Sequence, residues 1–91
     1  MHVSLEEAKE YTRIDSAYDD DLLLTLITTS ESLCENILRT DLSDEIQISE
    51  TVRIAILYGV SYLYENRESA DFKELITTLK YLLYGEREEV F

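Results

Sequence analysis

Apolar side chains recur every three or four residues in four separate stretches of the chain, which is the spacing of one face of an α-helix. The pattern predicts helices over residues of about 5–12, 20–39, 50–66 and 72–84. The second stretch is the clearest, with one face formed by Leu23, Leu26, Ile27, Ser30, Leu33, Cys34, Ile37 and Leu38. In the fourth, the predicted buried stripe is Phe72, Leu75, Ile76, Leu79, Leu82 and Leu83. We therefore expect an all-α fold, a single domain over residues 1–91 built as a small bundle of about four helices.

Polar residues at the ends of these stretches supply helix caps. The capping box that begins at Ser4 marks the start of the first helix, and Ser49 and Asp71 are the N-cap candidates of the third and fourth. The acidic run Asp19–Asp21 suits a helix N-terminus, where carboxylates meet free N–H groups. Gly85 stands where the left-handed residue after the last helix is expected.

An uncharged run from Ile54 to Tyr64 distinguishes the third predicted helix. Its 11 residues are too few to cross a bilayer, which needs about 20 apolar residues, so no membrane association is expected. Apolar side chains occupy nearly every face of this helix, which should therefore be buried nearly all round. In so small a domain, we expect part of that burial to come from a neighbouring subunit.

Composition agrees with a helical protein and sets its electrostatics. The 91 residues contain no proline and two glycines, whereas sandwiches and barrels need turn residues at every hairpin. Eight basic and twenty acidic side chains give a net charge of −12. Such a surface repels nucleic-acid phosphates and anionic lipid. The charge is uneven: −9 over residues 1–48 and −3 over residues 49–91.

No residue pattern in the sequence indicates catalysis, a cofactor or a metal. A calcium loop counted from Asp15 lacks its second acidic position and its glycine, so the acidic run is interpreted as capping. Cys34 is expected to be a buried structural thiol, and His2 a solvated residue at the terminus. Glu31 and Glu35 form a like-charged pair at i,i+4 on a face expected to be solvated. The first twenty residues lack the apolar region of a signal peptide. We expect a non-enzymatic protein.

Seven tyrosines form a surplus whose role the sequence leaves open. Tyr58, Tyr62, Tyr81 and Tyr84 lie at helical spacings, which is typical of rings packed in the core with their hydroxyls at the surface. Tyrosine is also enriched at protein interfaces, and for Tyr58 and Tyr84 the two interpretations have equal weight.

Three segments together resemble a known family. They read SLEEAKEYTRID, YDDDLLLTLITTSESLCENIL and VRIAILYGVSYLYENRES, and they are similar to the head–tail connector (head-completion adaptor) proteins of tailed phages and prophages. The matching residues are Leu5, Lys9, Arg13, Ile14, Asp20, Asp21, Leu23, Leu26, Ile27, Ala55, Ile56, Leu57, Tyr64, Asn66, Arg67 and Glu68. The resemblance covers residues of about 4–69. Two positions depart from it: Ser49 stands where such proteins often have proline, and no glycine precedes Arg39.

The resemblance implies a virion structural protein at the head–tail junction, made in the host bacterial cytoplasm during assembly. Such subunits form a homo-oligomeric ring under the portal protein, extend the DNA channel and dock the next tail or head-completion protein. DNA would pass through without specific binding.

Three groups of residues are the candidate sites on this interpretation. The expected subunit interface contains Tyr58, Tyr62, Tyr64 and Arg67, although Arg67 equally suits an intrachain pair with Asp71. Asp19, Asp20 and Asp21 are the candidate acidic residues facing the channel. The C-terminal tail of about residues 86–91, with Arg87, Val90 and Phe91, is a candidate partner-binding arm.

The alternative function is an acidic regulatory binder, such as an antitoxin or a DNA-mimic inhibitor of a basic protein. Its support is the negative charge concentrated in the first half of the chain.

Overall fold

A computed structural model describes residues 2–42 and 47–86, and within these ranges all regular structure is helical. The helices are α1 (Leu5–Thr12), α2 (Asp20–Leu38), α3 (Glu50–Glu65) and α4 (Phe72–Leu83), and a 3₁₀ turn, η1 (Tyr84–Glu86), follows α4. The sequence prediction of an all-α bundle of four helices is confirmed. Each predicted helix end lies within one residue of the observed end.

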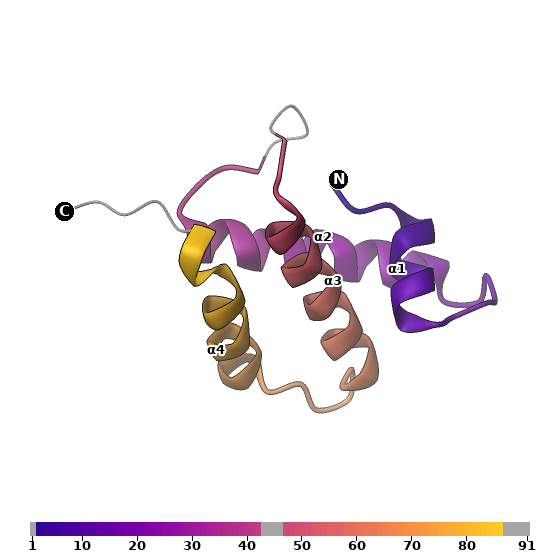
Figure 1. Ribbon diagram of the computed structural model, residues 1–91. Coiled ribbons are helices and arrows are strands. Elements are labelled where there is room, and N and C mark those ends of the chain that lie inside the picture. Colours follow the sequence, from indigo (N-terminus) through magenta and orange to yellow (C-terminus); the bar gives the residue numbers. More distant parts are fainter. Residues whose placement is uncertain (1, 43–46, 87–91) are drawn as a thin grey trace.

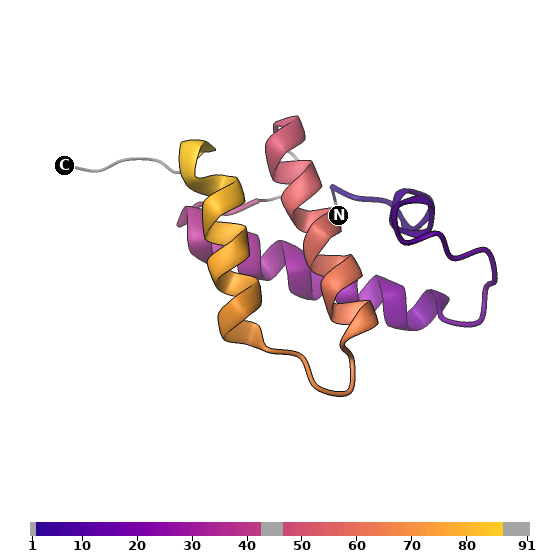
Figure 2. The same ribbon diagram turned by 60° about the horizontal axis from the view of Figure 1, so that its bottom comes forward.

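The helices form two layers that cross each other. α3 and α4 make an antiparallel hairpin, and α2 runs across it behind both helices (Figure 1). α1 packs on α2 and α3 on the far side of α3 from α4, and the second view shows the same order (Figure 2). α3 therefore occupies the centre of the molecule.

This central position accounts for the apolar surface of α3. The helix contacts α1, α2 and α4, and its buried residues are Val52, Ala55, Ile56, Leu57, Gly59, Val60 and Leu63. The sequence prediction assigned part of this burial to a neighbouring subunit, but the chain itself provides most of it. Ile54 is the exposed aliphatic residue of α3.

Three of the predicted caps form as expected. Ser4 and Glu7 make the reciprocal capping box, Ser49 accepts a hydrogen bond from Val52 N, and Asp71 accepts one from Glu74 N. Asp19 occupies the N-cap position of α2, but its side chain makes no capping hydrogen bond.

Two expectations for the last helix are wrong. Phe72, predicted to lie in the buried stripe, is 48% exposed because it begins α4 directly after the α3–α4 connection, at the closed end of the hairpin. Gly85 lies in the 3₁₀ turn and has no positive φ. The left-handed C-caps are instead Arg13 and Arg39, with φ of 61° and 57°. Glycine is the residue favoured in that conformation.

Candidate assembly surfaces

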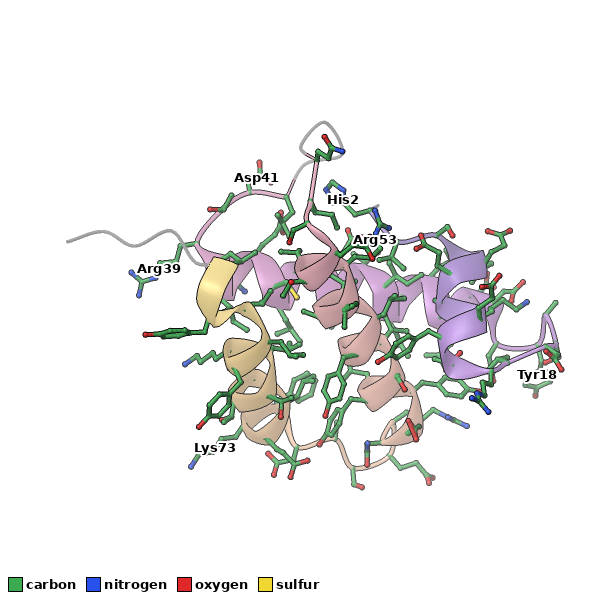
Figure 3. All side chains as sticks on the ribbon, viewed as in Figure 1. His2, Tyr18, Arg39, Asp41, Arg53 and Lys73 are labelled. Carbon is green, nitrogen blue, oxygen red and sulfur yellow. The ribbon has the colours of Figure 1, made fainter. Side chains whose placement is uncertain are left out.

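The residues before α1 are fixed to the helical core by charged side chains. Glu31 of α2 accepts hydrogen bonds from the backbone N–H groups of His2 and Val3, at 2.7 and 3.4 Å. Arg53 of α3 donates to the carbonyl of His2 at 2.7 Å, and Figure 3 shows these two residues beside each other. Val3 is completely buried as a result. The prediction of a solvated His2 is wrong.

The loop after α2 is held in a similar way. Glu35 accepts a hydrogen bond from Leu42 N at 2.7 Å, and the Leu42 carbonyl lies 3.1 Å from Nε2 of His2. Each carboxylate of the Glu31–Glu35 pair thus binds backbone N–H groups outside its own helix. On the sequence alone these two side chains were expected on a solvated face, because the backbone groups that they bind lie outside the helix and no helical spacing marks them.

Arg53→Met tests the N-terminal attachment while it keeps the aliphatic stem of the side chain. The guanidinium group also pairs with Glu7 at 3.2 Å and Glu50 at 3.4 Å. Because Arg53 is partly exposed, we expect the free energy of unfolding to fall by about 1 kcal/mol. Hydrogen exchange at the amides of His2 and Val3 should accelerate. Urea denaturation and hydrogen-exchange mass spectrometry measure these two effects.

Lys73→Met, measured at a concentration where the chain is monomeric, is the matched control, because it also removes one positive charge but from an exposed residue that makes no salt bridge within the described part of the chain. Equal stability and equal exchange in the two variants would contradict the assigned role of Arg53.

The acidic run at the start of α2 is divided among three environments. Asp19 accepts a hydrogen bond from the Tyr64 hydroxyl at 2.6 Å, and Asp20 pairs with Lys9 at 2.9 Å. Asp21 is exposed. The hydrogen bond to Asp19 raises the pKa of Tyr64. Of the three carboxylates proposed to face a channel, two therefore already have partners in the chain.

The tyrosines proposed for a subunit interface lie together on α3 and also make contacts within the chain. Tyr58 and Tyr62 stack with their ring centroids 6.5 Å apart. The Tyr62 hydroxyl bonds both the N–H and the carbonyl of Asp71, at 3.1 and 3.2 Å, and so fixes the start of α4. All three tyrosines are partly buried, and their role as an interface remains a prediction.

Arg67 lies in the turn after α3 and contacts the end of that helix. Its guanidinium group lies 4.5 Å from the centroid of the Tyr64 ring and donates to the Tyr64 carbonyl at 2.6 Å. The alternative salt bridge with Asp71 is not formed, and both residues are described by the structure. Arg87, Val90 and Phe91 of the proposed arm lie outside the described residues.

Cys34 is buried as predicted. Burial, with a smaller effect of Glu31, raises the pKa of its thiol to about 12, so the reactive thiolate is disfavoured. Among residues 2–42 and 47–86, no three His, Cys, Asp or Glu side chains come together as a metal site. Within the same ranges, each helix is too short or too polar to span a bilayer.

The most exposed aromatic side chains lie at two opposite ends of the molecule. Tyr18, in the segment between α1 and α2, is 91% exposed, whereas Tyr81 and Tyr84 near the C-terminal end of α4 are 81% and 70% exposed. Figures 1 and 2 place the α1–α2 segment and α4 on opposite sides of α3. Core packing, the role expected for the ring of Tyr81, is therefore wrong, and for Tyr84, for which core and interface had equal weight, the exposure excludes the core. Tyr18 was not a candidate residue on the sequence alone.

The chain matches the model of a known protein family. The model of the phage gp6-like head-tail connector protein family matches residues 2–83, which include all four helices. No curated protein and no solved structure gives a significant match.

Proposed function

The chain belongs to the phage gp6-like head–tail connector family, and from this membership we propose that it forms a homo-oligomeric ring between the portal protein and the next tail or head-completion protein. The family is structural and non-enzymatic. The protein is accordingly a phage structural connector, a component of the virion that interacts with other head and tail proteins. This assignment favours the connector over the acidic inhibitor as the function of the chain.

The observation that carries the proposal is the family match over residues 2–83. The distribution of exposed aromatic residues supports it. A ring subunit needs two different contact surfaces, one for each neighbour, because a head-to-tail contact joins unlike patches. The fold exposes aromatic side chains at two opposite ends of the molecule, which is the arrangement such a subunit requires.

The net charge suits passage of DNA through the proposed ring. With 20 acidic and eight basic side chains, the subunit has a net charge of −12, which repels phosphate. We propose that exposed Asp21 contributes to the negative wall of the channel. Asp20 contributes less net charge, because the ammonium group of Lys9 pairs with it, whereas the Tyr64 hydroxyl bonds Asp19 without neutralising its charge.

Native mass at rising protein concentration tests the ring. Light scattering behind a sizing column should show one large species of fixed mass, and negative-stain images of that species should show a closed ring. The measurement is made with the protein alone and after mixing with the cognate portal protein, because association can depend on a template. Duplex DNA should not be retained by the assembled ring at low salt.

A protein that remains monomeric at every concentration, both alone and with the portal protein, would contradict the proposed ring. An open filament would contradict the closed geometry. Tight, salt-sensitive binding to a basic host protein, without self-association, would instead support the acidic inhibitor.

A further inference from the structure

One face of α4 presents cations and aromatic rings to solvent. Lys73, Thr77, Lys80, Tyr81 and Tyr84 follow one another at helical spacing, and all five are exposed. We call them the α4 face. A hollow of about 320 Å³ lies over its C-terminal half, between Thr77, Lys80 and the two tyrosines. The exposed fractions of the two rings leave most of their apolar surface in contact with water.

The cations around this face pair with no carboxylate among the residues that the structure describes. Within residues 2–42 and 47–86, neither Lys73 nor Lys80 forms a salt bridge, and neither does Arg39, which lines an adjoining groove together with Lys80. Glu74 is the one carboxylate of α4. The chain carries 20 acidic and eight basic side chains, so these three cations, unpaired within the described residues, set this end apart from an otherwise acidic molecule.

The opposite end of the molecule has an apolar hollow surrounded by negative charge, which complements the aromatic rings and cations of the α4 face. A hollow of about 560 Å³ lies beside α1, and we call it the α1 hollow. The apolar side chains of Leu5 and Ile14 line it, together with the carboxylates of Glu6, Glu10 and Asp15. These three carboxylates are exposed, and no side chain in the described ranges bonds them.

Two cations also line the α1 hollow, but they leave it negative. Lys9 is paired with Asp20 at 2.9 Å, so that pair adds no net charge. Of the remaining charged side chains that line the hollow, Arg13 is positive and the three carboxylates of Glu6, Glu10 and Asp15 are negative. The hollow therefore combines an excess of negative charge with an apolar lining. An aromatic ring can pack on the apolar lining, and cations beside that ring can pair with the carboxylates.

The two surfaces lie on elements at opposite sides of α3, α4 on one side and α1 on the other. Figure 3 shows Arg39 and Lys73 at the α4 end of the molecule and Tyr18 at the α1 end. One chain therefore cannot join its own two surfaces, whereas two copies can. A contact between unlike patches at opposite ends repeats from copy to copy and generates a ring when the rotation closes.

We propose that the α4 face of one copy binds the α1 hollow of a second copy, with the rings of Tyr81 and Tyr84 against the hollow and the two lysines against its carboxylates. The inference rests on the proposed ring and names its subunit contact. Copies with a charge of −12 repel one another, so a stable contact must bring the few free cations to carboxylates. The tyrosine rings supply the apolar area that such a contact buries.

Charge reversal on each surface separately, and then on both, tests the contact. The first variant is Lys73→Glu/Lys80→Glu, the second is Glu10→Lys/Asp15→Lys, and the third carries all four substitutions and keeps the net charge of −12. None of these four side chains makes a bond within the described ranges, so the monomer should fold normally, and circular dichroism checks this.

Each two-substitution variant should need a protein concentration at least about tenfold higher to form the ring, because like charges then face each other. The four-substitution variant should recover much of the association, since its exchanged charges are again complementary. An equimolar mixture of the two-substitution variants should recover it as well. Tyr81→Ala/Tyr84→Ala should weaken assembly without any change in charge.

Assembly of both two-substitution variants at the wild-type concentration would overturn the inference and leave the ring of the proposed function intact. Failure of both the four-substitution chain and the mixture to recover association would overturn it as well. A wild-type protein that stays monomeric with and without the portal protein would overturn the ring itself, and this contact with it.

Discussion

Leu79→Ala should lower the free energy of unfolding by about 3 kcal/mol, within the range measured for leucine truncation in a packed core. Leu79 is completely buried on α4, which packs against both α2 and α3. Its removal leaves a cavity between the two layers, and the neighbouring helices can close it only in part. Urea denaturation at one fixed protein concentration measures the loss, since association would otherwise add stability.

Phe72→Ala is the matched control in the same helix. The sequence places both residues in one apolar stripe, but Phe72 is 48% exposed. Its truncation should cost less than about 1 kcal/mol, because little apolar surface returns to water and no enclosed cavity forms. Equal losses for the two variants would show that Phe72 is buried in solution, contrary to the structure.

Gly59→Ala should destabilise the protein by about 2 kcal/mol, although alanine is the better helix former by about 1 kcal/mol. Gly59 lies where α3 crosses α2, and an added Cβ would overlap Oγ of Ser30 and lie 3.1 Å from its Cβ. Ser30 is completely buried, and its hydroxyl donates to the Ile56 carbonyl at 2.8 Å. The helices must separate or the hydroxyl must rotate and lose this bond, and either change outweighs the gain in helix propensity.

A double-mutant cycle isolates this contact. Ser30→Ala alone should cost about 1 kcal/mol for the lost hydrogen bond. In the double variant Ser30→Ala/Gly59→Ala the overlapping atom is gone, so the combined loss should be smaller than the sum of the single losses by about 1 kcal/mol. The rescue should be partial, because the Cβ contact at 3.1 Å remains tight. Additive losses would contradict the steric explanation.

Gly85→Ala is the control for the same substitution elsewhere. An added Cβ at Gly85 meets nothing within 4 Å, and the residue has no positive φ. Its replacement should leave stability unchanged to within about 0.5 kcal/mol. If Gly85 were the left-handed C-cap expected from the sequence, alanine would instead destabilise the end of α4 by about 1 kcal/mol.

The sequence by itself determined the helices, most of their caps and the class of the protein. Helical periodicity and capping side chains act within a few residues, so Ser4, Ser49 and Asp71 could be assigned without knowledge of the fold. The motifs around Asp20 and Tyr64 pointed to the connector family, and the family match confirmed it. The burial of Cys34 followed from its place on an apolar face.

Only the tertiary structure decided which side chains face each other. Glu31, Glu35 and Arg53 hold backbone groups that are up to 51 positions away in the sequence, and no local pattern marks such partners. The crossing of α2 and α3 at Ser30 reverses the sign expected for the stability change of Gly59→Ala. The position of Phe72 beside the α3–α4 connection leaves its ring half exposed. Helix formation depends on local spacing, whereas the close approach of two helices depends on how every other element packs.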